Sequence, residues 1–265
     1  MDISPFVSNL PMGKDTRHFS TACASGSTSQ AAAVVEALEC GAPLLLLDED
    51  TSATNFMLRD ARMQLLVPDC DETLSPFVRH VRPAFERGGV SSVLVMGGSS
   101  DYLGVASLVI QMRHYQPVDV TARARALAPV AEPEPPGPPL AAPGRRLAAV
   151  GSAEAGPKGK PKLRALSRVL LQYGESEVSL AALEQLPDRA AAYAVARCIW
   201  FLFERLQMGG ATPREVMAAM DAALDAQALD VLSGRPEEPD GFLKRPRAID
   251  VIAAINRMRS LAAVK

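Results

Sequence analysis

Cysteine is scarce in this sequence, and long apolar runs are missing. The four cysteines stand far apart without a Cys-x-x-Cys pair, so neither a zinc site nor a disulfide framework is indicated, and we expect a reducing compartment. The longest apolar runs, such as residues 44–47 and 190–195, fall far short of the roughly 20 residues that a membrane-spanning helix needs. We therefore expect a cytoplasmic protein without a membrane segment.

The composition is that of a soluble globular protein, with 48% hydrophobic residues and a formal net charge of −2. It excludes fibrous and wholly disordered proteins. Proline is concentrated between Pro129 and Pro143, where it removes backbone donors and prevents a helix or sheet from running through. We therefore expect two domains, residues 1–125 and 162–265, joined by a Pro/Gly-rich linker over residues 126–161.

The first domain alternates predicted helices with short apolar runs. We expect helices at residues 30–40 and 76–87, and apolar runs lie at residues 44–47, 91–96 and 106–112. The runs are too short for buried helices, so we expect the first two to be buried strands. Strands of continuous hydrophobicity that are separated by helices favour a parallel α/β sheet.

The second domain is predicted to be wholly α-helical. Thr212 and Glu215 form a capping-box pattern with Pro213 at the first helical position, and two glycines before them end the preceding helix. The expected helices are residues 163–173, 180–186, 188–208, 213–228 and 246–262.

Two neighbouring carboxylates, Asp48 and Glu49, follow the first predicted strand. An acid at this position lies at the carboxyl edge of a parallel sheet, where ligands of open α/β folds bind and where Mg²⁺ on a nucleotide needs an oxygen ligand. A second acid beside it serves to orient or deprotonate an attacking water. The alternative is a solvated acidic turn.

A hydroxyl-rich loop, Ala24-Ser25-Gly26-Ser27-Thr28-Ser29-Gln30, opens the first predicted helix. Free backbone N–H groups, the helix dipole and several hydroxyls suit phosphate oxygens. The alternative is ordinary capping of the helix by serine.

The order of these segments resembles the second half of an ABC-class nucleotide-binding domain. There a signature loop, a Walker B strand ending in Asp-Glu and a D-loop follow one another, as do residues 25–30, 44–49 and 51–55 here. With residues 9–16 before them and 56–60 after them, the pattern is similar to a bacterial family of predicted ATPases of the ABC class. The resemblance covers residues 2–121 and, more loosely, the helical tail. It implies a partial P-loop NTPase sheet of α/β class followed by an α-helical domain.

The resemblance implies ATP and Mg²⁺ as cofactors, and hydrolysis of ATP in a head-to-tail dimer. Asp48 would coordinate Mg²⁺, and Glu49 would act as general base or orient the attacking water. The signature residues would contact a nucleotide held by a second protomer, and residues 52–55 would line the seam between protomers. The nucleotide-binding residues expected from these two segments are Ser25, Gly26, Ser27, Gln30, Ser52, Thr54 and Asn55.

One departure from the family pattern concerns the switch histidine. Gly97 stands where the family has that histidine, after the strand at residues 91–96. Ser99 or Asp101 would then replace it as a sensor of the γ-phosphate, or this step works differently. The alternative is that Gly97-Gly98 forms only a tight turn.

A second departure is the lack of a phosphate-cradling Gly-x-x-x-x-Gly-Lys-Ser/Thr in the 265 residues. We therefore expect poor affinity for nucleotide, and a chain that is the C-terminal part of a longer ATPase or of a gene read from a late start. Its partner would be a second copy or an N-terminal ATPase half. Apolar sheet surface left open would favour association.

The rival function is a catalytically silent interaction module with possible nucleic-acid binding. A basic stretch spans Arg145 to Arg168, and a second basic set lies in and beside the last predicted helix: Lys244, Arg245, Arg247, Arg257, Arg259 and Lys265. The stretch lacks interleaved aromatics and reads more readily as a solvated tether. The helix reads more readily as an amphipathic helix docked on the domain.

Overall fold

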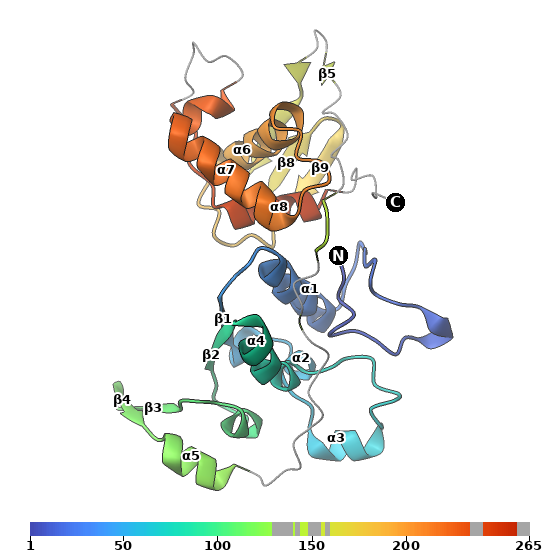
Figure 1. The fold of residues 1–265 in the computed structure, drawn as a ribbon, viewed down its shortest axis with the longest axis vertical. Coiled ribbons are helices and arrows are strands. Elements are labelled where there is room, and N and C mark those ends of the chain that lie inside the picture. The colour runs from blue at the N-terminus through green and yellow to red at the C-terminus, as the bar shows by residue number, and fades with distance from the viewer. Residues whose placement is uncertain (129–139, 141–143, 148–154, 157–159, 234–240, 259–265) are drawn as a thin grey trace. The chain divides into compact units, whose positions relative to one another are not determined.

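The computed structural model describes residues 1–128, 140, 144–147, 155–156, 160–233 and 241–258. The chain divides into two compact units, Met1–Pro143 and Gly144–Lys265, each with its own sheet and helices (Figure 1). Most of the predicted proline-rich linker lies outside the described residues, and its boundaries stay a prediction.

A parallel pair of strands lies at the centre of the first unit. β1 (Leu44–Asp48) pairs with β2 (Ser91–Val95) in a register that sets Leu44 opposite Ser91 and Asp48 opposite Val95. The parallel α/β arrangement predicted from the sequence is confirmed. Because both strands end at the same edge, the loops that begin at Glu49 and Met96 lie side by side.

The helices of the first unit connect and flank these strands. α1 starts before the predicted residue 30 because Ser25 caps it, accepting a hydrogen bond from the Thr28 amide at 3.3 Å. The predicted helix at residues 76–87 is a 3-10 turn, Phe77–Arg79, followed by α4, which ends at Gly89 with a left-handed φ of 66°. The α-helices are α1 (Gly26–Glu39), α2 (Thr54–Met57), α3 (Ala61–Leu66), α4 (Val81–Gly88) and α5 (Thr121–Leu127).

Only one face of the β1–β2 sheet is covered. Leu45 is 7% exposed and packs in the core, but Leu46 is 73% exposed and Val95 65% exposed. The prediction of two fully buried strands is therefore wrong for one face. A continuous apolar run predicts a strand whose sheet is packed against other elements on both faces. Within the described residues, the first unit packs against only one face of the β1–β2 sheet.

The third apolar run is not part of this sheet. Residues 110–113 form β3 (Ile110–Arg113), which pairs with β4 (Gln116–Asp119) in an antiparallel hairpin. Its two-residue turn places His114 at φ 49° and Tyr115 at φ 63°, as hairpin turns of this length require. The third apolar run therefore belongs to a separate hairpin and not to the parallel sheet.

An aromatic cluster anchors the first unit. The rings of Phe6, Phe56 and Phe77 have centroids 5.3–6.5 Å apart, and the His80 ring lies 4.6 Å from Phe6. All four side chains are fully buried. Because Phe56 belongs to α2, this cluster fixes the end of the segment that follows β1.

The second unit begins with strands where helices were predicted. β7 (Leu163–Ser167), β8 (Leu170–Tyr173) and β9 (Ser176–Ser179) form an antiparallel sheet, so the predicted helix at residues 163–173 is wrong. Apolar residues alternate along the strands, and Leu163, Leu171 and Val178 are buried. The predicted helix at residues 180–186 is also wrong, since this segment forms turns that bury its leucines. Two short strands, β5 (Ala155–Gly156) and β6 (Lys160–Pro161), pair with each other.

Three helices complete the second unit, so the prediction of a helical domain is confirmed for this part, but the prediction that it is wholly helical is wrong. α7 has the predicted capping box, with Glu215 N–H donating to Thr212 Oγ1 at 3.3 Å and Thr212 N–H donating to Glu215 Oε2 at 2.8 Å. Residues 259–262, the end of the predicted last helix, lie outside the described residues. The helices are α6 (Arg189–Trp200), continued by a π-helical turn (Phe201–Arg205), α7 (Pro213–Gln227) and α8 (Ala248–Asn256). None of the helices in the described ranges has the length and apolar character to cross a membrane.

Candidate functional site

The hydroxyl-rich loop forms the capped beginning of α1. Ser25 Oγ lies 2.9 Å from Thr28 Oγ1 and 3.2 Å from Ser27 Oγ, and Ser27 is buried. A Cβ added to Gly26 would meet only Ala53 Cβ, at 3.9 Å. The loop is therefore a capping motif, and its hydroxyls and the first amides of α1 come together at one helix end.

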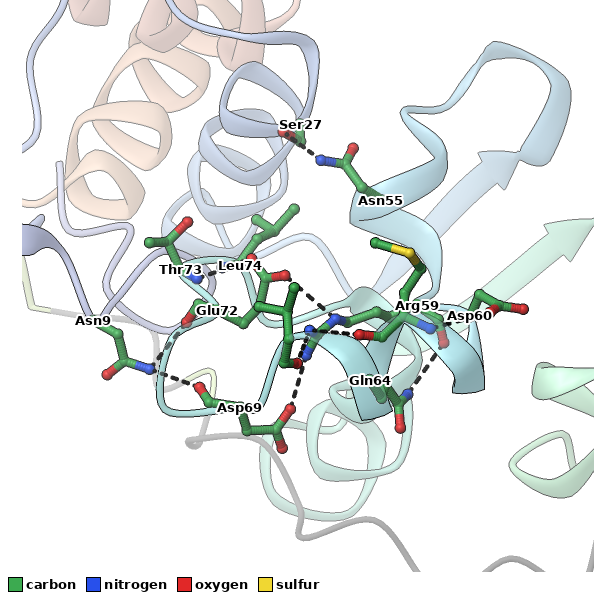
Figure 2. A network of polar contacts seen from close by, with 12 residues as sticks. Asn9, Ser27, Asn55, Arg59, Asp60, Gln64, Asp69, Glu72, Thr73 and Leu74 are labelled. Atoms are coloured by element: carbon green, nitrogen blue, oxygen red, sulfur yellow. Dashed lines mark hydrogen bonds and ion pairs between the residues drawn. The ribbon is translucent and has the colours of Figure 1, made fainter.

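Gln30 joins this loop to the segment that follows β1. Its Nε2 donates to Ser52 Oγ at 2.8 Å, and its Oε1 accepts from the Ala53 amide at 2.9 Å. Asn55 Nδ2 donates to Ser27 Oγ at 3.4 Å, a contact drawn in Figure 2. The two segments singled out in the sequence thus share one hydrogen-bonded cluster.

Thr54 stands apart from this cluster. It is the first residue of α2, it is exposed, and its side chain makes no hydrogen bond to the rest of the described chain. Among the signature and seam residues expected from the sequence, the structure brings together Ser25, Ser27, Gln30, Ser52 and Asn55.

The two acids at the end of β1, Asp48 and Glu49, have different partners. Asp48 Oδ1 accepts from the Asp50 amide at 3.2 Å and caps a short 3-10 turn. Glu49 Oε2 accepts from the amides of Gly97 and Gly98, at 2.7 and 2.8 Å. The Gly98 and Gly97 amides hold the pKa of the Glu49 carboxyl below its usual value, which keeps it ionised.

Ser99 and Asp101 lie in the same loop after β2. The Asp101 amide donates to Ser99 Oγ at 3.2 Å, and the Tyr102 hydroxyl donates to the carbonyl of Met57 at 2.6 Å. Burial, and then the Asp101 and Glu49 carboxylates, raise the pKa of the Tyr102 hydroxyl. Its neutral hydroxyl fastens this loop to the end of α2.

A buried arginine, Arg59, holds the chain beyond α2 (Figure 2). Its side chain is 9% exposed and its guanidinium pairs with Asp69 at 3.0 Å and Glu72 at 3.3 Å. It also donates to the carbonyls of Met63 and Val67. The sequence did not indicate this role for Arg59, because Asp69 and Glu72 lie in a loop beyond α3. Their spacing from Arg59 matches neither the helical nor the strand repeat.

Three of the basic side chains at the last predicted helix pair with acids of the same unit: Lys244 with Asp188, Arg245 with Asp221 and Asp225, and Arg247 with Asp250. Arg257 donates to the carbonyl of Ala253, and Arg259 and Lys265 lie outside the described residues. A shallow depression of about 440 Å³ lies between α7 and α8, and its charged walls include the paired Asp221 and Arg245. These pairs neutralise the positive charge of Lys244, Arg245 and Arg247.

The arrangement of the first unit gathers carboxylates, hydroxyls and backbone amides at the carboxyl edge of a parallel sheet. These groups are hard oxygen ligands and anion-binding donors, the chemistry of phosphoryl-transfer sites. In the described ranges, no group of three or more His, Cys, Asp or Glu side chains is arranged to hold a metal ion. A metal at Asp48 would therefore take its other ligands from a bound nucleotide and water.

Comparison with known protein families agrees with this arrangement. Residues 162–264 match a family model described as the MRB1590 C-terminal domain. Comparison with curated proteins gives no match. Residues 1–136, just over half of the chain, match the ABC_ATPase family model, described as a P-loop domain. The chain belongs to this ABC-class ATPase family.

Proposed function

We propose that the first unit contributes to ATP binding and hydrolysis in a head-to-tail dimer. The observation that carries this proposal is the position of Glu49, held at the carboxyl edge of the parallel strands beside the Asp48 carboxylate. Ligands of open α/β sheets bind at this edge. Phosphoryl transfer depends mainly on positioning and charge neutralisation, which such groups supply.

Asp48 and Glu49 have separate roles in this proposal. Asp48 is exposed and keeps Oδ2 available as an oxygen ligand of Mg²⁺, while Oδ1 accepts from the Asp50 amide. The metal supplies charge neutralisation at the transferred phosphoryl group. Glu49 orients the attacking water. Because two amides hold its pKa low, it is a weak proton acceptor, and orientation suits it better than complete deprotonation.

The cluster around Gln30 forms the second half of the proposed site. Ser25, Gly26 and Ser27 contact the γ-phosphate of a nucleotide bound mainly by the other protomer. Ser52, Thr54 and Asn55 line the seam between protomers, and Ser99 or Asp101 senses the γ-phosphate. In this proposal a separate ATPase half that carries a phosphate-cradling loop completes the site, since the 265 residues have no Gly-x-x-x-x-Gly-Lys-Ser/Thr.

ATP turnover with and without Glu49 tests the proposal. We expect Glu49→Gln to lower the rate of Mg-ATP hydrolysis by about 100-fold or more, since it removes the water-orienting carboxylate. Glu86→Gln, at an exposed glutamate of α4, makes the same chemical change away from the site. Turnover is measured for the 265-residue chain and for the chain extended through the reading frame upstream of Met1. Absence of turnover in both, or equal rates in the two variants, would contradict the proposal.

A further inference from the structure

Gly97 and Gly98 occupy an unusual place beside Glu49. Neither glycine has a left-handed φ, so backbone conformation does not explain them. A Cβ added to Gly98 would lie 3.3 Å from Glu49 Oε1 and 3.7 Å from Oε2, whereas one added to Gly97 would meet nothing within 4 Å. At position 98, therefore, glycine allows the backbone to approach the carboxylate closely.

The contact uses only one oxygen of the carboxylate. Both amides donate to Glu49 Oε2, at 2.7 and 2.8 Å. Within the described chain, Oε1 accepts no hydrogen bond. Hydrogen bonds to an ionised acceptor are short and strong, so this pair restricts the rotation of the carboxylate.

The loop that carries these amides is itself fixed. The hydroxyl of Tyr102, which is 4% exposed, donates to the Met57 carbonyl at 2.6 Å. Gln30 holds Ser52 and Ala53 between these two points. The segment from Glu49 to Met57 is thus held at both ends by the loop after β2 and in the middle by α1.

We propose that the main-chain amides of Gly97 and Gly98 position the Glu49 carboxylate for the hydrolytic water, and that glycine at position 98 lets the backbone approach without displacing the carboxylate. They are positioning residues, because they act through Glu49. This inference rests on the proposed ATPase function. It deepens that function by assigning the orientation of Glu49 to backbone donors.

The contact itself is tested without any nucleotide. In amide NMR spectra of the 265-residue chain, Glu49→Gln replaces a charged acceptor with a neutral one. The amide protons of Gly97 and Gly98 should move upfield, while that of Gly104, in the 3-10 turn of the same loop, stays in place. Unchanged resonances at both glycines would overturn the proposal, whatever the turnover.

The positioning role is tested by kinetics in whichever form of the protein turns over ATP. In Gly98→Ala, the added methyl displaces the carboxylate by a few tenths of an ångström, and we expect kcat to fall about 3- to 10-fold with KM unchanged. Gly104→Ala is the matched control, because a Cβ there meets nothing within 4 Å. Thermal melting of both variants checks that the fold is retained.

The outcomes separate this inference from the function on which it rests. A wild-type rate that Glu49→Gln abolishes, with Gly98→Ala equal to Gly104→Ala, would refute the positioning role and keep the ATPase function. Faster turnover in Gly98→Ala would also refute it, since the amides would then restrain Glu49. If no form hydrolyses ATP, the function and the positioning role both fail, and the NMR result still decides whether the amides bind Glu49.

Discussion

The two units of this chain bury their sheets to different extents. In the second unit, the inward side chains of the three-stranded sheet, such as Leu171, Tyr173 and Val178, are at most 3% exposed. In the first unit, β1 and β2 leave one apolar face open, with Leu46 73% and Val95 65% exposed. The second unit therefore covers the inward face of its sheet fully, whereas the first combines a core on one face of its sheet with an open apolar face and with polar contacts around the candidate site.

The largest expected effect tests the core of the second unit. Leu171→Ala removes a fully buried side chain from β8 and should lower the free energy of unfolding of this unit by about 2–5 kcal/mol. Urea unfolding followed by Trp200 fluorescence measures it, because the only tryptophan lies in α6. Leu166→Ala on β7, where the leucine is 44% exposed, is the control and should cost less than about 1 kcal/mol. Equal losses would contradict the assigned burial.

The next effect concerns the polar contacts of the first unit. Arg59→Met removes one guanidinium partner of Asp69 and Glu72, while Arg79 still pairs with Asp69 at 3.1 Å. The acids are partly exposed, but Arg59 also donates to the carbonyls of Met63 and Val67, so we expect a loss of about 1–2 kcal/mol. Hydrogen exchange should accelerate across residues 59–74. Arg62→Met changes an exposed arginine of α3 and should leave exchange there unaltered. Acceleration in both variants would show that Arg59 has no special role.

Local patterns in the sequence predicted the positions of Asp48 and of the Thr212–Glu215 capping box. Asp48 directly follows an apolar run, and Thr212 lies three residues before Glu215. In both cases the structure depends on residues that are close in the sequence, so a local pattern predicts it. The strands at residues 163–173 were missed because their leucines and alanine also suit a helix, and packing against α6 decides between the two. The contact of Glu49 with Gly97 and Gly98 was missed for a different reason. Glu49 is separated from Gly97 by 48 positions in the chain and from Gly98 by 49. The donors are backbone amides, which every residue except proline has, so the sequence does not mark them.

A third effect tests whether the open face of the first sheet binds other copies of the chain. We expect the 265-residue chain to self-associate at high concentration, because exposed apolar sheet surface favours contact. Leu46→Ser should weaken association about tenfold or more, since burial of a leucine contributes roughly 1.5–3 kcal/mol. Sedimentation velocity measures this. Leu65→Ser on α3, where the leucine is 87% exposed, tests whether any exposed leucine has the same effect. A monodisperse wild-type monomer would contradict the prediction.

The smallest effect is a pH dependence in the second unit. Hydrogen bonds from the Thr212 amide and hydroxyl hold the pKa of the Glu215 carboxyl below its usual value. A folded-state pKa below the unfolded value means that the unfolded chain binds the proton more tightly, so the capping box stabilises the unit above the unfolded pKa of about 4.3. This stability is lost as the pH falls through the folded pKa. The hydrogen bond from Lys244 lowers the pKa of Asp188, which caps α6, so acid weakens the unit in more than one place.

The difference between wild type and Glu215→Gln isolates the capping box. Their urea midpoints, followed by Trp200 fluorescence, should converge as the pH falls below about 4. A constant separation at every pH would show that the ionised carboxylate does not stabilise α7.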